Sequence, residues 1–543
     1  MAIDWKTKSV LIVDDFGQMR MAIKSMIDSV SPAQVDNVGN GEDAMAAMLR
    51  SRYDLILCDY NLGRGKSGQQ VLEEARHLEL ISADTVFLMI TAEALMPRVL
   101  GVIENRPDDY LTKPFVRQVL LQRAERAMER KAQMRELNTA IRDKDLDRAS
   151  EICRASLEQK QRHALDQLRR LAEVHVEFGN LAQAEPLYRQ VLARRELPWA
   201  RFGIAKVQFL NGQIDEACAG FQGLIADNQH FVEVYDWLAR CQQARNENEA
   251  ALETLRTGTK LSPDSLRRQR ALGDLALTLD DRATAEKAYG SAVKLGRTSA
   301  FRAADEHLAL ARIWAAQGRA GEGLKLLRET RAMMKKNPLE EMRLTLGEAV
   351  MHQDAGHQSD AKRLLERATE SYAEISGAVP AETALQLVET SLRLGQGDLA
   401  KQAATEVARN FFDQEDIRHK LHELYADDKD QGEIQALLTA TREQVARENN
   451  QAVALFRGGD AEAARVAIES VAKQAPRSLE VNLNAARILM HLIDQGTPKA
   501  TAYRFRIEEY LRQAQRIDAA DARLKHLKVR YEGPPNTLAA DRG

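Results

Sequence analysis

Short apolar runs alternate with helical patterns over the first 125 residues or so of the chain. The apolar runs lie at residues 9–13, 34–38, 54–58, 85–90 and 109–112. The helical patterns lie near residues 17–30, 41–52, 68–78, 96–104 and 115–130. Continuous apolar strands that alternate with helices are typical of a parallel sheet with both faces covered. We therefore expect an α/β fold here, a doubly wound five-stranded parallel sheet whose site lies at the carboxyl ends of the strands.

Beyond about residue 131 the strand patterns stop, and helical patterns continue through the rest of the chain. Small residues recur there every 33 to 39 positions, at Ala149, Ala184, Ala217, Ala251, Ala285, Gly323, Ala361 and Ala400. A residue that favours a turn lies five positions before most of them: Gly179, Gly212, Asn246, Asp280, Gly318, Gly356 and Gly395. Self-similarity at such a period indicates an all-α solenoid of stacked helix pairs, in which the small residues allow close packing.

This pattern resembles the tetratricopeptide repeat (TPR), a helix–turn–helix unit of about 34 residues. The resemblance is clear over residues 131–300, whereas the period lengthens over 300–415 and residues 416–445 fit poorly. A further unit is expected around 458–476, with Ala463 in the small position. The resemblance implies that a protein partner binds on the concave surface, which the first helix of each pair forms.

Three aromatic side chains fall on the first helix of one repeat, roughly at concave positions: Trp199, Phe202 and Phe209. Aromatic residues are enriched at the hot spots of protein interfaces. Packing between neighbouring repeats explains them equally well, so both interpretations stay open.

Composition narrows the choice of partner and compartment. The 77 Lys and Arg residues nearly balance the 80 Asp and Glu residues, which leaves a net charge of −3 and gives no electrostatic footprint for nucleic acid or an anionic membrane. The chain contains neither a long apolar run nor an N-terminal signal peptide pattern. Its four cysteines, with no close pair, exclude a disulfide framework or a cysteine-based zinc site. We therefore expect a cytoplasmic protein.

Candidate chemistry gathers where the predicted strands end. The first strand runs into Asp14 and Asp15, the third into Asp59, the fourth into Thr91 and the fifth into Lys113. Three carboxylates in one crevice would repel one another without a cation, and a small set of oxygen ligands suits Mg²⁺. A lysine and a threonine hydroxyl beside them can stabilise a transferring phosphoryl group, with one carboxylate as the nucleophile.

Four segments around these strand ends resemble the receiver domain of two-component response regulators, a flavodoxin-like fold, over residues 7–128. The segments are residues 13–15, 58–61, 90–92 and 110–115. The resemblance implies that Asp59 is the phospho-acceptor and that Asp14 and Asp15 hold Mg²⁺. The main-chain carbonyl of Asn61 would complete the metal site.

The same resemblance implies roles for residues on the last two strands. Thr91 would donate a hydrogen bond to the phosphoryl group, and Lys113 would form an ion pair with it. Tyr110 would be the aromatic switch whose rotamer follows Thr91. The bond between Lys113 and Pro114 is a candidate cis peptide.

We expect a receiver domain over residues 1–128, a TPR array over 129–415 that is degenerate after 300, further helical repeats over 416–532 and a disordered tail over 533–543. Residues 115–142 contain neither Pro nor Gly, so the last receiver helix is expected to run directly, or with a small break, into the first repeat.

No basic helix-turn-helix, nucleotide-binding motif or hydrolase motif follows the receiver segments, so the array itself must be the output. The predicted function is that of a phospho-acceptor response regulator in which Asp59 phosphorylation controls protein–protein interaction through the TPR array. Such a protein is not an enzyme beyond its own phosphorylation and dephosphorylation. The alternative is a passive TPR scaffold whose receiver only docks a kinase or phosphatase.

The expected partners follow from the two resemblances. One is a cognate histidine kinase or phosphotransfer protein, and the other is a protein on the concave face of the array. Neither nucleic acid nor a membrane is expected as a partner, and the receiver resemblance also allows a homodimer.

Overall fold

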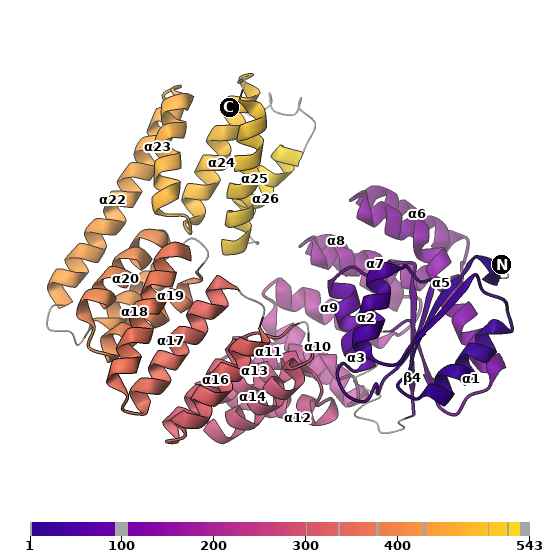
Figure 1. The fold of residues 1–543 in the computed structure, drawn as a ribbon. Coiled ribbons are helices and arrows are strands. Elements are labelled where there is room, and N and C mark those ends of the chain that lie inside the picture. Colours follow the sequence, from indigo (N-terminus) through magenta and orange to yellow (C-terminus); the bar gives the residue numbers. More distant parts are fainter. Residues whose placement is uncertain are drawn as a thin grey trace. The chain divides into compact units, whose positions relative to one another are not determined.

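The computed structural model describes residues 3–92, 107–299, 301–334, 337–375, 379–426, 431–497, 499–518 and 521–532. The chain divides into two compact units, Met1–Glu306 and His307–Gly543 (Figure 1). The helix expected near 96–104 and the tail expected over 533–543 lie outside the described residues.

A five-stranded sheet forms the first part of the chain, as the alternating apolar runs predict. Its strands are β1 (Ser9–Val13), β2 (Gln34–Val38), β3 (Leu55–Asp59), β4 (Val86–Thr91) and β5 (Asp109–Thr112). They lie in the order β2-β1-β3-β4-β5, and every pair is parallel. The expected doubly wound parallel sheet is therefore confirmed.

Helices cover both faces of the sheet. They are η1 (Trp5–Thr7), α1 (Gly17–Asp28), α2 (Gly41–Arg50), α3 (Gly68–His77) and α5 (Arg117–Arg142). Side chains alternate along a strand, so Leu11 and Val13 of β1 pack with α2 and α3, while Val10 and Ile12 pack with α1 and α5. Burial on both faces explains why the central strands are apolar at nearly every position.

Helix α5 joins the sheet to the repeats. Leu120 and Ala124, in its first half, pack on the sheet, and Leu137 and Ala140, in its second half, pack in the core of the first repeats. The helix is continuous over 26 residues. The expected direct run from receiver to first repeat is therefore confirmed.

Helix pairs follow α5 through the rest of the described chain. In the first unit they are α6 (Leu146–Glu158), α7 (Ala164–Glu177), α8 (Leu181–Leu192), α9 (Pro198–Leu210), α10 (Ile214–Asp227), α11 (Glu233–Ala244), α12 (Asn248–Leu261), α13 (Leu266–Thr278) and α14 (Arg282–Gly296). Helix α15 (Asp305–Ala316) begins where the units divide. The second unit continues with α16 (Ala320–Met333), α17 (Pro338–Asp354), α18 (Gln358–Ile375), α19 (Ala381–Arg393), α20 (Gly397–Asn410), α21 (Glu415–Leu424), α22 (Gln431–Arg457), α23 (Ala461–Gln474), α24 (Leu479–Asp494), α25 (Ala500–Ile517) and α26 (Ala522–Glu532).

The residues expected to make the turns end the first helix of each pair. All seven adopt positive φ angles, between 54° and 80°. After α7, for example, Gly179 N–H donates to the carbonyl of Val176 (3.1 Å) and Asn180 N–H donates to the carbonyl of His175 (2.8 Å). These two bonds make a Schellman motif, which needs the left-handed conformation at Gly179. The small residues five positions later are all buried, which confirms the repeat register up to Ala400.

The structure corrects the register of the later repeat by one residue. Ala463 is half-buried, whereas Ala464 is fully buried and lies five residues after Gly459, which has a φ of 90°. Two successive glycines, Gly458 and Gly459, occur at this turn, and the sequence alone does not tell which one takes the positive φ. The poor fit of residues 416–445 has a physical cause too, because the 10-residue α21 is followed by the 27-residue α22.

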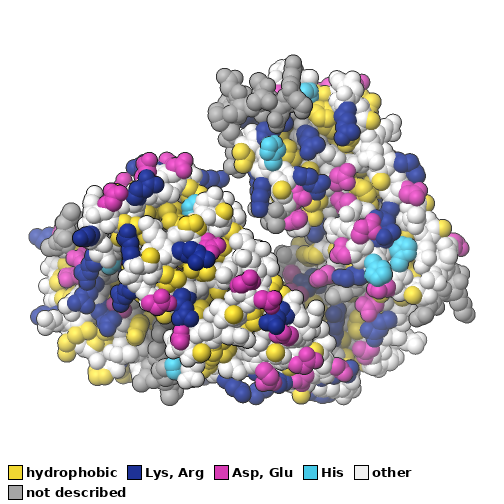
Figure 2. Space-filling model, turned by 180° about the vertical axis from the view of Figure 1, so that it is seen from behind, with side chains coloured by type: hydrophobic (Ala, Val, Ile, Leu, Met, Phe, Trp, Pro, Cys, Tyr) yellow, Lys and Arg dark blue, Asp and Glu magenta, His cyan; other side chains and the backbone are white. Residues whose placement is uncertain are grey.

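Charged side chains of both signs are interspersed on the face drawn in Figure 2, in agreement with the net charge of −3. Within the described part of the chain, none of the helices combines the length and the apolar character that a membrane crossing requires.

Candidate functional site

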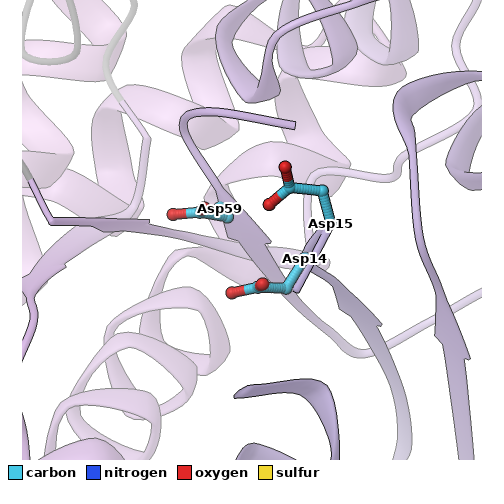
Figure 3. A group of neighbouring side chains, drawn as sticks. All are labelled: Asp14, Asp15 and Asp59. Carbon is cyan, nitrogen blue, oxygen red and sulfur yellow. The ribbon is translucent and has the colours of Figure 1, made fainter. Parts of the chain in front are cut away.

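Three carboxylates gather at the carboxyl ends of β1 and β3, as predicted. Asp14 and Asp15 follow β1, and Asp59 is the last residue of β3. Each can offer one oxygen such that all three oxygens lie within 4.8 Å of one another (Figure 3). Asp14 and Asp59 are buried and Asp15 is exposed, so the group opens to solvent on the Asp15 side.

Lys113 reaches this acidic group from the end of β5. Its Nζ lies 2.8 Å from Asp14 Oδ2 and 3.2 Å from Asp59 Oδ1. Its main-chain N–H donates to the carbonyl of Thr91 (2.8 Å), which holds the end of β5 against the end of β4. The peptide bond to Pro114 is cis, as expected.

Hydrogen bonds fix Asp14 beside the first helix. The main-chain N–H of Phe16 donates to Asp14 Oδ1 (2.9 Å), and Arg20 Nη1 donates to the main-chain carbonyl of Asp14 (2.6 Å). Sequence reasoning missed Arg20, because an arginine in the first turns of an amphipathic helix looks like any other surface residue.

The electrostatics of the site favour a bound cation. Burial raises the pKa of Asp59 to about 6; the charge of Lys113 opposes this, and the charges of Asp14 and Asp15 add to it. Burial lowers the pKa of Lys113, but hydrogen bonding to Asp14 and the charge of Asp59 outweigh burial, so its pKa is raised. Three carboxylates against one ammonium group leave an excess of negative charge. An all-oxygen donor set of this size fits Mg²⁺, which binds few carboxylates and keeps several waters.

The loop after Asp59 lies tightly against the acidic group. A Cβ at Gly63, where φ is 71°, would come within 2.9 Å of Asp15 Oδ2, and a Cβ at Gly68 would come within 2.2 Å of the carbonyl of Asp59. Asn61 is exposed, and its side-chain oxygen accepts a hydrogen bond from Gly63 N–H (3.2 Å). Glycine is therefore required where this loop approaches the site.

Thr91 and Tyr110 lie on the neighbouring strands β4 and β5. Thr91 is buried and pairs with Thr112 in the sheet, and Tyr110 pairs with Met89. Tyr110 is 39% exposed, and the Arg123 guanidinium lies 6.0 Å from its ring centre. The receiver resemblance makes Tyr110 the switch that follows Thr91. The two residues lie on adjacent strands, with Thr91 buried and Tyr110 at the surface.

A groove of about 1650 Å³ lies between the receiver and the first repeats. Its walls include Tyr110 and Asp108 of the receiver, Arg135 of α5 and Trp199 of α9. The Arg169 guanidinium lies 5.2 Å from the Trp199 ring centre. Trp199 is therefore a surface residue of this groove.

The other two aromatic residues of α9 pack between helices. Phe202 is buried against Phe221 and Phe231, with ring centres 5.7 and 5.2 Å away, and Phe209 meets the Trp237 ring edge-on at 5.6 Å. Trp199 lines the groove and also packs against the Tyr188 ring, with ring centres 6.4 Å apart, so it fits both interpretations, whereas Phe202 and Phe209 pack between helices.

Comparison with known proteins agrees with the site. Residues 10–125 match the response regulator receiver domain. The chain is 31% identical over 121 residues to chemotaxis protein CheY of Pseudomonas aeruginosa, an alignment that covers 22% of this chain and 96% of the relative. It is 28% identical over 125 residues to CheY-3 of Vibrio cholerae, which covers 23% of this chain and 95% of that protein.

Among solved structures, the chain is similar to a tetratricopeptide repeat protein of Parabacteroides merdae at 16% identity and a TM-score of 0.36, over 48% of this chain and 99% of that protein. Independently of that match, the helix pairs, their Schellman turns and their buried small residues have the TPR pattern. The chain belongs to the response regulators, and its receiver domain is followed by a long TPR-like array of paired helices.

Proposed function

We propose that the protein is a phospho-accepting response regulator whose receiver controls the binding of a protein partner to the TPR array. The observation that carries this proposal is the acidic group of Asp14, Asp15 and Asp59 with Lys113 paired to two of its carboxylates. Bringing this many charges together under partial burial costs folding free energy. A passive scaffold gains nothing from them, so the site favours chemistry over assembly alone.

Asp59 is the acceptor in this proposal. Its carboxylate oxygen attacks the phosphorus atom of a phosphohistidine on a kinase or phosphotransfer protein. A P–O bond to Asp59 forms while the P–N bond of the donor breaks, and the imidazole of the donor leaves with the electron pair. Hydrolysis by water later breaks the acyl phosphate, so the catalysis is confined to the protein's own phosphorylation and dephosphorylation.

The surrounding residues stabilise the negative charge of the phosphoryl group that is transferred to Asp59. The three carboxylates and the main-chain carbonyl of Asn61 would hold Mg²⁺, which when bound would supply positive charge to offset the negative charge of the phosphoryl group. Lys113 lies 3.2 Å from Asp59 Oδ1 and forms the ion pair with the phosphoryl group. The Thr91 hydroxyl donates a hydrogen bond to it, and Tyr110 follows Thr91 as the switch.

The groove links this switch to the array. Tyr110 and Trp199 both line the groove between receiver and repeats. A change at Tyr110 would therefore alter the wall of a surface that the first helices of the repeats also form. We propose that the protein partner binds there, with Trp199 as one anchor.

Affinity capture from lysate tests this function, with the chain in Mg²⁺ with and without a beryllofluoride phosphate mimic and with Asp59→Asn as the matched control. We expect the captured partners to differ between the two wild-type samples and to be the same in both Asp59→Asn samples. Identical partners in all four samples would contradict the switch and favour the scaffold.

A further inference from the structure

The α3 side of the receiver contacts the repeat array more than 200 residues further along the chain. Gln70 Nε2 donates to the main-chain carbonyl of Leu295 (3.1 Å), and the Thr298 hydroxyl donates to Gln70 Oε1 (2.9 Å). At the other end of α3, the ring centres of His77 and Phe301 lie 5.0 Å apart. Helix α3 thus contacts the end of α14 and the segment after it at two places, Gln70 and His77.

A further contact involves the residue directly after the proposed phospho-acceptor. The Tyr60 hydroxyl donates to Asp264 Oδ2 (3.2 Å), in the loop between α12 and α13. Tyr60 is 7% exposed, so this contact is made by a side chain that is otherwise covered.

The backbone of Tyr60 is tied to the parts that form the acidic site. Its N–H donates to the carbonyl of Ile90 in β4 (2.7 Å), and its carbonyl accepts from Gly68 N–H at the start of α3 (2.9 Å). Gln70 in turn caps α3, because Ser67 N–H donates to Gln70 Oε1 (3.0 Å). The end of β3, the loop after it and the start of α3 are therefore one connected structure that carries both Asp59 and the contacts to the array.

The two attachments of the array lie on opposite faces of the sheet. Helix α5 packs with α1 on one face, and α3 packs with α2 on the other. The array therefore leaves the receiver from one face, at the end of α5 (Arg142), and is back at the opposite face by Leu295, with the groove between them. Separation at the α3 contacts would leave α5 as the attachment and would widen the groove.

We propose that Tyr60, Gln70 and His77 form a docking surface for the chain's own repeats, through Asp264, Leu295, Thr298 and Phe301, and that phosphorylation of Asp59 changes the affinity of this docking. We call these seven residues the α3 docking surface. The coupling rests on the proposed function of Asp59. Because coupling between two sites is reciprocal, loss of the docking must also change the stability of the phosphorylated state.

Hydrogen–deuterium exchange on the full chain tests the docking, with a double variant that leaves the receiver unchanged, Asp264→Ala with Phe301→Ala. The control is Phe178→Ala with Asp398→Ala, which removes an equally exposed phenylalanine and an exposed aspartate elsewhere in the array. We expect amide exchange of residues 60–78 to rise several-fold in the first variant and not in the control. Equal exchange in both variants would overturn the docking surface.

The equilibrium affinity of the chain for the phosphate mimic beryllofluoride in Mg²⁺, measured in the same two variants, tests the coupling. We expect the dissociation constant to change at least two-fold in the docking variant and to stay at the wild-type value in the control. Faster exchange with an unchanged dissociation constant would overturn the coupling. Absence of any phosphorylation in the wild type would instead overturn the proposed function, and the exchange result would still decide the docking.

Discussion

Asp59 shows how burial and neighbouring charge set the chemistry of one residue. Its carboxylate is buried beside Asp14, and Lys113 offsets part of the negative charge. Burial and the acidic neighbours hold its pKa at about 6. The ionised form, which is the nucleophile in the proposed function, therefore weakens the fold when no cation is present.

Asp59→Asn should stabilise the metal-free protein at pH 7–8 by about 1–3 kcal/mol. Well below pH 3.8, the usual pKa of an aspartate, both the folded and the unfolded states of the wild type are protonated at Asp59, so the two proteins should then be equally stable. As the pH rises through 3.8 and on to 6, the unfolded wild type ionises first and the folded wild type loses stability relative to the variant. Denaturant unfolding curves across this range check the prediction; a stability difference that is the same at pH 4 and pH 8 would contradict it.

Two buried arginines provide a contrast at the same scale. Arg268 pairs with Asp236 through two bonds of 2.7 and 2.8 Å. Arg477 is 8% exposed, and among the described residues its Nε has no hydrogen-bond partner. Burial lowers the pKa of Arg477, and the like charge of Arg516 adds to this.

Arg477→Met should therefore leave stability unchanged or raise it by about 1–3 kcal/mol, because it removes a desolvated charge and keeps an apolar chain against Phe411. Arg268→Met should lower stability by about 3–5 kcal/mol, because it leaves Asp236 without its partner. Thermal unfolding of both variants checks these two predictions. A large loss for Arg477→Met would show that its guanidinium is satisfied in solution.

At the scale of elements, the turns between helices depend on backbone conformation more than on contacts. Gly212 has a φ of 80°, and a Cβ added there would meet no atom within 4 Å. Asn246 takes the same position in the next repeat with a φ of 59°. These two sites separate the cost of the left-handed conformation from any effect of packing.

Gly212→Ala should destabilise the first unit by about 1 kcal/mol, because alanine is strained at positive φ. Asn246→Gly should stabilise it by up to about 0.5–1 kcal/mol, because glycine adopts this conformation without strain. Urea unfolding curves of both variants check these changes. We expect the midpoint to shift and the m-value to stay at that of the wild type. Effects of the same sign would contradict the shared Schellman geometry.

The sequence predicted these elements because strands, turns and small residues are local signals. The strand ends brought Asp14, Asp15, Asp59 and Lys113 together by topology alone. The contacts of Tyr60 with Asp264 and of Gln70 with Thr298 could not be predicted, because they join residues 204 and 228 positions apart and carry no sequence pattern. Their geometry depends on the curvature of the repeats between α5 and α14, to which each repeat adds a small rotation.

At the scale of the whole molecule, the continuous helix α5 connects the receiver to the first repeats, and the α3 docking surface connects it to the repeats at α12–α14. A continuous helix transmits a rotation, whereas a flexible joint would dissipate it. In α5, Lys131 Nζ pairs with Asp108 Oδ1 (3.0 Å), and Asp108 directly precedes β5. The joint is thus tied to the strand that carries Tyr110.

Insertion of Gly-Ser-Gly after Arg130 should leave phosphorylation of Asp59 intact and reduce the phosphorylation-dependent change in partner affinity several-fold. The remaining dependence would pass through the α3 docking surface. To check this prediction, partner affinity is measured with and without beryllofluoride for both the insertion variant and the wild type. Full retention of the dependence would show that α5 does not transmit the signal.

The most direct test of the whole account is the site of phosphorylation itself. The purified chain is incubated with Mg²⁺ and a small-molecule phosphodonor, and intact mass and peptide mapping follow. The account predicts one added phosphoryl group on Asp59 that requires Mg²⁺ and is absent from Asp59→Asn. Equal labelling of the wild type and Asp59→Asn, or a label on another residue, would contradict it.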